Sequence, residues 1–538
     1  MAMHITRVHI EGFRRFGNFD LELNPTFNIL VGDNETGKSS ILEALSIVLS
    51  RQYNGQTLDY SLDPYLFNVT MVADYFEKLR GDENASPPQI LIEAYLNDDS
   101  DAPALARLKG RNNTKNEDCP GLKLTIEVDS DHVDALKEYA RDDSNPAVLP
   151  VEFYRCHWRS FADNGITIRN LSFRAKTIDT SLQRAYRGPN RYVAQLVDDV
   201  LTEQQRRELS LAYKKLRHRF AQEPGVKTIN EHLEKQGSPA TSKKLTVQVD
   251  MSSRSTWGSA ITPHLDDLPF DCAGKGELCR IQMRLAIADS DKSQVLLIEE
   301  PENHLSHSNL NMLMDDISRD CADRQAIVTT HSAFVLNRLG IDNLRLISHN
   351  GQTTTLTNMT PDTKDYFMKL PGYDTLRLIL SRRCILVEGP SDELIVQRAY
   401  KNKHGKLPLE DGVDVISVRS LAFKRFLEIA KHLKLDVRVV TDNDGDVAAL
   451  KSKYSDYMNG TSTTIQICYD SDGTYQTLEL QLLKVNSLEL LNTILGTKHA
   501  DDDALLKFMR NNKTDYALKM FETDQTWCTP EYIANAIK

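Results

Sequence analysis

The sequence contains a glycine-rich loop whose residue types and spacing suit phosphate binding. Residues 32–39 read Gly-Asp-Asn-Glu-Thr-Gly-Lys-Ser and fit the pattern G-x-x-x-x-G-K-[ST] between a strand-like and a helical segment. Backbone N–H groups of such a loop and of the following helix N-terminus surround phosphate oxygens. Lys38 would neutralise the β- and γ-phosphates of ATP, and Ser39 would ligate magnesium. The nucleotide-binding candidates here are Asn34, Gly37, Lys38, Ser39 and Ser40.

Two carboxylates after another apolar run supply the chemistry that ATP hydrolysis needs. Glu299 and Glu300 follow the apolar residues 295–298, at the strand end where α/β proteins bind ligands. Glu299 would hold magnesium through water, and Glu300 would orient or deprotonate the attacking water. The alternative is an exposed acidic turn. His331 ends the next expected strand and could sense the γ-phosphate, although a histidine at a strand end is more often structural.

A second acidic group lies in the last third of the chain. Glu388 follows an apolar run, Asp392 lies in the first turn of the next helical segment, and Asp442 and Asp444 follow a later apolar run. In a parallel sheet these strand ends lie side by side, so the carboxylates can converge. Such a cluster cannot stay fully ionised without a cation, and Mg²⁺ or Mn²⁺ suits it. Either half alone is common in ordinary turns; the two together predict a metal site that could act on phosphodiesters.

The elements that position these groups indicate an α/β protein with several domains. The 538 residues exceed what one compact core holds. Residues 39–49 read as a helix, and residues 181–240 form a helical block between the two ATPase motifs, suited to dimerisation or DNA contact. We expect an ATPase domain over residues 1–180 and 241–362, the helical insertion over 181–240, and a connector with a second α/β domain over 363–538. Strands are expected at residues 5–10, 19–23, 27–31, 89–96, 122–128, 245–249, 295–298, 326–329 and 344–347.

The order of the ATPase motifs resembles the ABC-type ATPases of the SMC, Rad50 and RecF group. The resemblance rests on the glycine-rich loop, Glu-Glu-Pro-Glu-Asn-His-Leu at 299–305, Thr-Thr-His-Ser at 329–332 and the opening Ile-Glu-Gly-Phe-Arg-Arg-Phe at 10–16. In that group two heads enclose ATP, and a signature motif from one head completes the site of the other. Gly274 and Gly276, in Ala-Gly-Lys-Gly-Glu-Leu, are the candidates. This segment departs from the usual Leu-Ser-Gly-Gly-Gln, so a simple loop before a helix is the alternative.

The second acidic group resembles a Toprim domain, the metal-binding module of topoisomerases, primases and certain nucleases. An ABC-type ATPase followed by Toprim is similar to the OLD (overcoming lysogenisation defect) family of nucleases over almost the whole chain. The implied fold is α/β: an ABC-type ATPase head with a helical insertion, followed by a Rossmann-like Toprim domain. The implied metal ligands are Ser39 and Glu299 at the ATP site, and Glu388, Asp392, Asp442, Asp444 and Glu479 at the Toprim site. The implied catalytic residues are Glu300, His331, Glu388, Asp442 and Lys513.

Two of these assignments depend on short matches near the end of the chain. Glu479 lies in Thr-Leu-Glu, and Lys513 begins a Lys-x-x-x-Ala segment, where it could stabilise charge on the transition-state phosphate. Exposed glutamate and lysine on helices are common, so an ordinary surface role is the alternative for both. Residues 419–421 read Arg-Ser-Leu where the family often has glycine, which puts that local loop in doubt.

The resemblance implies an ATP-regulated, divalent-metal-dependent DNA endonuclease or nickase that takes part in defence against phage. ATP and Mg²⁺ are the expected cofactors, with Mg²⁺ or Mn²⁺ at the Toprim site. DNA and a second copy of the chain, in a homodimer or higher oligomer, are the expected partners, together with a defence-system protein or a retron nucleic acid. The alternative is an ATP-gated DNA clamp or scaffold, similar to RecF, whose Toprim module does not cleave. A topoisomerase would need a tyrosine nucleophile, which the sequence does not reveal.

Charge and composition narrow the possible partners. The net charge of −11 argues against a uniformly basic nucleic-acid coat, but not against a local groove. Basic residues cluster at 206–219 and at 382–425, where they could contact phosphates or form a solvated helix face. The sequence lacks a secretory pattern, a run of about 18 apolar residues and a Cys-x-x-Cys pair, so we expect a cytoplasmic protein outside the membrane.

Overall fold

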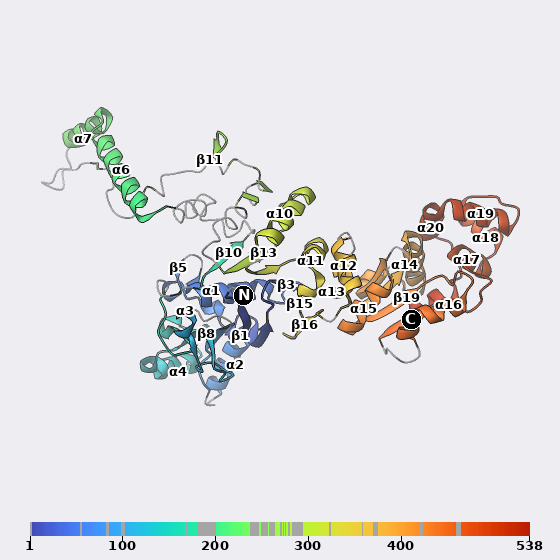
Figure 1. Ribbon diagram of the computed structural model, residues 1–538, viewed down its shortest axis with the longest axis horizontal. Helices are drawn as coiled ribbons and strands as arrows, with labels where there is room; N and C mark the ends of the chain where they lie inside the picture. Colours follow the sequence, from blue (N-terminus) through green and yellow to red (C-terminus); the bar gives the residue numbers. More distant parts are fainter. Residues whose placement is uncertain are drawn as a thin grey trace. The chain divides into compact units, whose positions relative to one another are not determined.

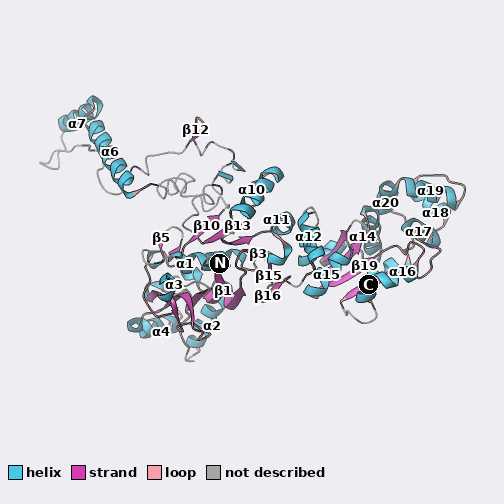
Figure 2. Cartoon of the chain, in the orientation of Figure 1, coloured by secondary structure: helices cyan, strands magenta, loops and turns pink. Residues whose placement is uncertain are grey.

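In the computed structural model the chain divides into two compact units. The first comprises Met1–Thr26 and Ser39–Thr329, and the second comprises Phe27–Lys38 and Thr330–Lys538. The structure describes residues 3–53, 56–81, 85–97, 103–167, 171, 173–179, 201–236, 247–248, 257, 264–269, 272, 274, 276–277, 280–281, 284, 294–321, 324–357, 359–369, 375–418, 423–458 and 464–538. Within these residues no helix combines the length and apolar character that crossing a membrane requires. Figure 1 labels the elements in chain order, and Figure 2 distinguishes helices from strands.

The N-terminal region builds an antiparallel sheet in the order β2-β1-β6-β8-β7, with β9 pairing β8. Every residue of β6 is buried, because this strand lies inside the sheet. The buried carboxylate of Glu93 in β6 accepts a 2.7 Å hydrogen bond from the Tyr95 hydroxyl and pairs with Lys123 at 3.3 Å, which offsets its desolvation. The strands are β1 (Ile5–Phe13), β2 (Phe16–Glu22), β6 (Ile90–Leu96), β7 (Lys109–Gly110), β8 (Cys119–Val128) and β9 (Tyr154–Ser160).

A second sheet carries the nucleotide motifs and has the order β10-β13-β14-β3-β15-β16. Its central strands are continuous apolar runs with buried side chains, as expected for a parallel sheet covered on both faces. The strands are β10 (Ala175–Asp179), β13 (Val295–Glu299), β14 (Gln325–Thr329), β3 (Phe27–Val31), β15 (Leu344–Ile347) and β16 (Thr353–Thr355). The predicted strands at 27–31, 295–298, 326–329 and 344–347 are therefore confirmed, whereas the one expected at 245–249 lies mostly outside the described residues.

The main helices of this region are α1 (Lys38–Ser50), α2 (Val69–Arg80), α4 (Val133–Arg141), α10 (His307–Asp320) and α11 (Ala333–Leu339). Smaller elements are α3 (Pro103–Ala106) and the strand pairs β4 (Gln52–Tyr53) with β5 (Gln56–Thr57) and β11 (His264–Leu265) with β12 (Leu268–Pro269). The helix α1 agrees with the helix predicted at 39–49. It begins at the lysine of the glycine-rich loop, so its free N–H groups face that loop.

Within the expected insertion the structure describes α6 (Glu203–Ala221) and α7 (Pro224–Gln236), two consecutive helices visible in Figure 2. Residues 181–200 and 237–240 of that range lie outside the described residues. The helix α6 starts with a capping box, in which the Thr202 hydroxyl accepts from the Gln205 N–H and the Gln205 side chain accepts from the Thr202 N–H. This reciprocal pair satisfies two donors at the start of a helix that is exposed along most of its length.

The C-terminal domain is a doubly wound parallel sheet in the order β18-β17-β19-β20. Its strands are β17 (Arg383–Val387), β18 (Val413–Ser417), β19 (Asp436–Val440) and β20 (Ile465–Cys468). Its helices are α14 (Pro390–His404), α15 (Phe423–Leu433), α16 (Val447–Lys453), α17 (Leu478–Val485), α18 (Leu488–Leu495), α19 (Asp502–Asn511), α20 (Lys513–Glu522) and α21 (Glu531–Ala536). Side chains of α14, α17 to α21 and the strands share one apolar core, and Figure 1 shows α18, α19 and α20 gathered together.

Two short helices, α12 (Pro361–Lys369) and α13 (Thr375–Leu380), lead into this domain. Both pack on α11, and the buried Thr375 hydroxyl donates to the Asn337 side-chain oxygen at 2.8 Å. On the other side, the Glu428 carboxylate of α15 accepts from Thr360 N at 2.5 Å and from the Thr363 hydroxyl at 2.6 Å. A glutamate of the C-terminal domain therefore holds both the residue before α12 and a hydroxyl in its first turn.

Candidate nucleotide and metal sites

The glycine-rich loop is built around the lysine that ends it. The buried Lys38 ammonium donates to the carbonyl oxygens of Gly32 at 2.9 Å and of Asp33 at 3.0 Å. A Cβ on Gly32 would lie 2.5 Å from the carbonyl oxygen of Ile347, and Gly37 has φ +95°, so both positions require glycine. Ser39 is exposed at the start of α1 and Asn34 is exposed in the loop. The loop thus has the shape and donors for phosphate, with the lysine folded onto its own backbone.

His331 leaves the sheet next to the strand that feeds this loop. Thr330 N, just before His331, donates to the carbonyl oxygen of Leu30 at 3.3 Å. His331 is exposed, and the hydroxyl of Ser332 caps α11 by accepting from Val335 N at 3.4 Å. A change in position of His331 would therefore act directly on the start of α11.

Glu299 and Glu300 lie where their strand was expected to place them. Glu299 is the last residue of β13 and pairs in register with Thr329 of β14. Glu300 has φ +43°, an uncommon conformation for a non-glycine residue that often marks functional positions. Its backbone N–H donates to the Thr329 carbonyl at 3.0 Å, and its Oε2 accepts from the Asn303 amide at 2.7 Å. The carboxylate of Glu300 is thus oriented by its own loop.

The signature candidate is described only in part. Gly274 and Gly276 are placed, whereas residues 273, 275 and 278 lie outside the described residues. A Cβ on Gly276 would approach the His304 carbonyl oxygen to 2.5 Å, so a side chain would not fit there. The segment therefore packs against the loop that follows Glu300.

In the C-terminal domain the ends of β17 and β19 are joined by a carboxylate. Glu388 Oε1 accepts from the Thr441 hydroxyl at 2.7 Å and from Asp442 N at 3.2 Å. Asp442 Oδ2 in turn accepts from Leu478 N at 3.3 Å, at the start of α17. Asp392 Oδ2 accepts from Gly389 N at 3.2 Å, which caps α14. The side-by-side arrangement that the sequence predicted for Glu388 and Asp442 is present.

The electrostatics show that four carboxylates share this place. Burial, then the negative charges of Glu388 and Glu479, raise the pKa of Asp392 to about 7. Burial, then the charges of Asp392, Glu388 and Glu479, raise the pKa of Asp442 to about 8. Shifts with these causes indicate a surplus of negative charge among partly desolvated carboxylates. Hard divalent cations with oxygen ligands neutralise such a surplus, so the donor set fits Mg²⁺ or Mn²⁺.

The carboxylates are near one another but do not form a complete set of metal ligands. Among the described residues, no three His, Cys, Asp or Glu side chains already converge as a complete ligand set. Mutual repulsion between like charges keeps such side chains apart. Asp444 is exposed on the turn after Asp442, with φ +48°, and is not among the charges that raise the pKa of Asp392 or Asp442.

Lys513 reaches the edge of the same cluster. Its ammonium lies 3.9 Å from Glu479 Oε1, and Glu479 is buried whereas Lys513 is largely exposed. Both residues begin helices, Lys513 at the start of α20 and Glu479 in the first turn of α17. The structure thus places the Lys513 ammonium beside Glu479, on the solvent-exposed side of the acidic group.

Sequence reasoning missed three residues that organise this site. Thr441 holds Glu388, the Tyr516 hydroxyl lies 3.4 Å from Glu479 Oε1, and Asn443 bonds the neighbouring loop. Thr441 and Asn443 flank Asp442 directly, which is the signal that could have drawn attention to them. Tyr516 lies in the same helical turn as Lys513, but nothing in its spacing distinguishes it from a core residue.

Several basic residues proposed for DNA contact have other partners in the structure. Arg383 pairs with Asp436 at 2.8 Å, and the Arg425 guanidinium stacks 4.1 Å from the Tyr366 ring centroid. In the first cluster, Arg207 pairs with Glu203 at 2.8 Å and Arg217 is buried. Arg419 lies outside the described residues. These side chains contribute to local packing and ion pairing, whereas Lys214 and Lys215 stay exposed on α6.

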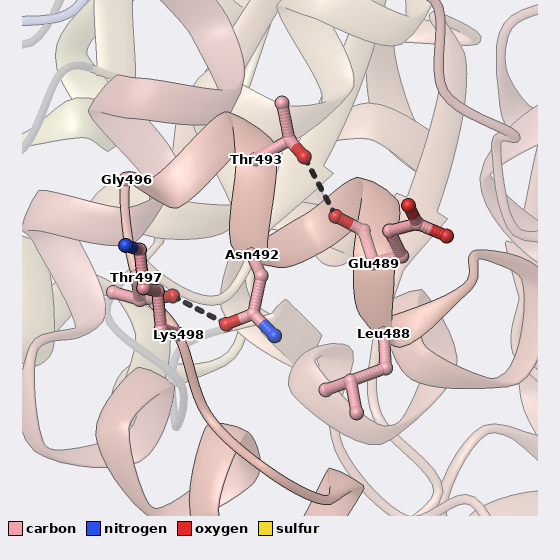
Figure 3. Close-up of a pocket in the computed structure, with 7 residues that line it drawn as sticks. All are labelled: Leu488, Glu489, Asn492, Thr493, Gly496, Thr497 and Lys498. Atoms are coloured by element: carbon pink, nitrogen blue, oxygen red, sulfur yellow. Dashed lines mark hydrogen bonds between the residues drawn. The ribbon is translucent and has the colours of Figure 1, made fainter.

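A separate cavity of about 600 Å³ lies at the end of α18 and contains none of the predicted residues. Figure 3 shows that its polar groups bond one another: the Thr497 hydroxyl donates to Asn492 Oδ1 at 2.7 Å, and the Thr493 hydroxyl donates to the Glu489 carbonyl at 2.8 Å.

The fold and the two sites define a class of protein: an α/β ATPase joined to a Toprim domain. Residues 27–337, more than half of the chain, match the family described as "AAA domain, putative AbiEii toxin, Type IV TA system", and residues 3–50 match a further AAA domain. Residues 379–444 match "Overcoming lysogenization defect protein-like, TOPRIM domain". The chain belongs to this AAA family and has the ATPase–Toprim architecture of the OLD family. The Toprim match includes Glu388, Asp392, Asp442 and Asp444, and ends before Glu479 and Lys513.

Curated relatives match only a short segment. The chain is 41% identical over 58 residues to the DNA replication and repair protein RecF of Xanthomonas euvesicatoria pv. vesicatoria (strain 85-10), which is 11% of this chain and 16% of that protein. It is 54% identical over 43 residues to RecF of Enterobacter sp. (strain 638), 8% of this chain and 12% of that protein. The chain thus spans less than a fifth of the length of each of these relatives.

Solved structures with partial similarity include ATPase heads. The structure of the recombination mediator protein RecF with ATP covers 66% of this chain and 99% of its own, with a TM-score of 0.33 and 10% identity. The SMC head domain from Thermotoga maritima covers 64% of this chain and 94% of its own, with a TM-score of 0.30 and 12% identity.

Proposed function

We propose that this protein is an ATP-regulated, divalent-metal-dependent DNA endonuclease or nickase. The observation that carries the proposal is the group formed by the half-buried Glu388, Asp392 and Asp442 with the buried Glu479, in which burial and then the neighbouring negative charges raise the pKa of Asp392 and Asp442. The cost of such an arrangement is offset when a doubly charged cation occupies it.

The residues of the site have separate tasks in phosphodiester hydrolysis. A cation bound there would polarise the phosphate and stabilise the attacking and leaving oxygens. Glu388 and Asp442 would hold the cation from adjacent strand ends, and Thr441 fixes the orientation of Glu388. Lys513, at the solvent side of Glu479, would stabilise charge on the phosphate in the transition state. Asp444, exposed beside this group, would be available to a second cation.

ATP is proposed to bind the glycine-rich loop, with Lys38 on the β- and γ-phosphates and Ser39 and Glu299 on magnesium. Glu300 would activate water and His331 would respond to the γ-phosphate. Gly274 and Gly276 would complete the site of a second head. The loop geometry around Gly32 and Gly37 and the held carboxylate of Glu300 support these roles.

A short packed route within the second unit supports regulation by ATP. The helix α11 begins directly after His331, packs on α12 and α13, and is bonded to α13 through Asn337 and Thr375. The start of the connector helix is held by Glu428 of α15, which contacts β19, the strand that leads to Asp442. We therefore propose that the nucleotide state biases the position of α15 and, with it, the spacing of the carboxylates.

The direct test is cleavage of supercoiled, linear and single-stranded DNA by the purified protein, with and without ATP, across Mg²⁺ and Mn²⁺. We expect cleavage that EDTA abolishes. Glu388→Ala should reduce it more than about 100-fold, beyond the loss seen for outer-shell partners of metals. The matched control is Glu393→Ala, which removes an acidic residue from the same helix turn as Asp392 but outside the cluster.

Full cleavage by Glu388→Ala would contradict the site assignment. DNA-stimulated ATP turnover with tight DNA binding and no strand scission by the wild type would favour the alternative, an ATP-gated DNA clamp. The role in defence against phage is proposed from the similarity to the OLD family. It predicts that Glu388→Ala abolishes any protection the intact system gives cells against plaque formation, whether the partner is a second protein or a retron nucleic acid.

We also propose that the protein is a homodimer and that α6 takes part in the interface. Leu209, Tyr213, Leu216 and Phe220 recur at spacings typical of one apolar helix face, and Leu216 and Phe220 are 62% and 60% exposed. Exposed apolar stripes of this kind mark interaction surfaces. We expect Leu216→Glu with Phe220→Glu to shift the protein from dimer to monomer in analytical ultracentrifugation. Lys214→Glu, on the opposite face of α6, should leave the dimer intact; a dimer in the double variant would exclude α6.

A further inference from the structure

Asn443, between the two aspartates of the Asp-Asn-Asp turn, is buried and fully bonded. Only 3% of it is exposed. Its amide nitrogen donates to the carbonyl oxygens of Asp470 and Asp472, both at 2.9 Å, and its side-chain oxygen accepts from Gly445 N at 3.0 Å. A buried amide with every strong bond made fixes its surroundings, because losing either partner leaves an unsatisfied polar group.

The loop that Asn443 holds is itself fastened to α17. Lys484 of α17 pairs with Asp470 at 2.6 Å, and the Gln481 amide donates to the Tyr475 carbonyl at 2.7 Å. The two segments also touch closely: a Cβ on Gly473 would lie 3.2 Å from the Gly445 carbonyl oxygen. Asn443 therefore links the turn that carries Asp442 to the helix that carries Glu479.

This link matters because those two segments supply carboxylates to one cluster. Among the described residues, Asp442 itself contacts α17 through a 3.3 Å hydrogen bond, which Leu478 N donates to Asp442 Oδ2. A cation can contact both carboxylates only if these two segments stay close together. A neutral amide that bonds backbone atoms can hold them close without adding charge to the site.

We infer that Asn443 is a positioning residue that sets the distance between Asp442 and Glu479 and thereby the affinity of the site for a divalent cation. The inference rests on the proposed function only in taking these carboxylates as cation ligands. It predicts that the segments remain close before the cation arrives, so less free energy is spent on ordering them when it binds.

The test is Mn²⁺ binding to the full chain without DNA or nucleotide, followed by electron paramagnetic resonance. Asn443→Ala should weaken Mn²⁺ binding by about 10–100-fold, the range for outer-shell partners of metal ligands. Cleavage by this variant should recover at high Mn²⁺, because the ligands themselves remain. Asn443→Ser retains an acceptor for Gly445 N and serves if the alanine variant does not fold; it should also bind Mn²⁺ more weakly.

Asn486 offers a matched control in the same domain. It is also buried, and its amide donates to the Leu482 and Cys528 carbonyls, both at 3.0 Å, while its oxygen accepts from Cys528 N at 2.7 Å. Asn486→Ala should cost similar stability and leave Mn²⁺ affinity unchanged. Equal Mn²⁺ affinity in Asn443→Ala and wild type, or equal weakening in Asn486→Ala, would overturn the inference.

A fourth variant separates this inference from the proposed activity. Asp442→Asn should lose Mn²⁺ binding, and a high Mn²⁺ concentration should not restore it. If this variant binds Mn²⁺ as tightly as wild type does, the proposed metal site and the proposed role of Asn443 are both wrong. If Mn²⁺ binding changes as expected but no variant, nor the wild type, cuts DNA, the role of Asn443 stands and the nuclease proposal fails.

Discussion

Replacing Glu300 by glutamine is expected to lower ATP turnover by about 10²–10⁴-fold, the usual contribution of a positioned acid or base. ATP binding should persist, because Lys38 and the loop backbone are untouched. The expectation rests on how Glu300 is held. Its backbone conformation is uncommon for a side-chain-bearing residue, and the Asn303 amide orients one carboxylate oxygen at 2.7 Å. Glutamine fills the same space but cannot accept the proton of the attacking water.

The neighbouring residue Glu302 gives a control with the same change of charge in the same loop. Glu302→Gln should keep most of the turnover, whereas Lys38→Ala should lose ATP binding itself. Steady-state hydrolysis and binding of a fluorescent ATP analogue distinguish the three outcomes. Wild-type turnover in Glu300→Gln would show that another residue activates water and would remove Glu300 from the catalytic set.

A nucleotide-trapped Glu300→Gln protein also tests regulation. If the route through α11 and Glu428 conveys the nucleotide state, the trapped protein should show altered hydrogen exchange in β19 and α15 when ATP is added. If hydrogen exchange in β19 and α15 is the same with and without ATP, the proposed coupling is wrong. The proposed role of Glu300 in ATP hydrolysis would not be affected by that result.

The glycine-rich loop and the second acidic group could be predicted because each depends on the chain near it in sequence. A buried strand followed by a glycine-rich loop and a helix predicts phosphate binding whatever surrounds it, and β3 and α1 form that unit. The convergence of Glu388 and Asp442 followed from β-α-β connectivity alone, since parallel strands end at one edge. Both inferences needed only periodicity and handedness.

What the sequence could not predict depends on contacts between distant segments. Asn443 reads as a turn residue, and its bonds to residues 470 and 472 appear only once the loops meet. Asp442 and Asp444 are both aspartates that follow β19, but they differ in their surroundings. The turn leaves Asp444 exposed, whereas Asp442 accepts a hydrogen bond from Leu478 N at the start of α17. Likewise Arg383 and Arg425 looked like phosphate ligands, and pair instead with Asp436 and the Tyr366 ring. A charge count along the chain does not reveal such partners.

The metal-free protein is expected to lose stability as pH rises from about 4 to 8. The folded-state pKa of Asp392 is about 7 and that of Asp442 about 8, both above their ordinary value near 4. The unfolded chain therefore releases these protons first, and within this window the folded state binds more protons than the unfolded state. Stability from these groups is complete at the acid end and is lost as pH passes the folded-state values.

Other groups around the cluster do not reverse this direction. Glu388 on β17 and Glu479 on α17 add negative charge, and burial raises the pKa of Tyr516 and Tyr532 well above the ordinary value, so both hydroxyls stay neutral. Lys513 carries the nearby positive charge and is largely exposed. One pKa unit corresponds to about 1.4 kcal/mol, so the two aspartates together represent several kcal/mol.

A divalent cation should restore the stability that is lost when the two aspartates are deprotonated, because its positive charge takes the place of the protons. Calorimetry of EDTA-treated protein should show the melting temperature of the C-terminal domain falling by roughly 10–20 °C between pH 5.5 and 8.5, at the usual dependence of Tm on free energy. Saturating Mn²⁺ should raise this melting temperature more at pH 8.5 than at pH 5.5, because at low pH it competes with protons. Asp442→Asn removes one buried acid, so its metal-free protein should lose less stability with pH and gain less from Mn²⁺. Equal pH dependence and equal metal stabilisation in the two proteins would mean that Asp442 does not titrate in a shared acidic pocket, and the cation would then have to bind elsewhere.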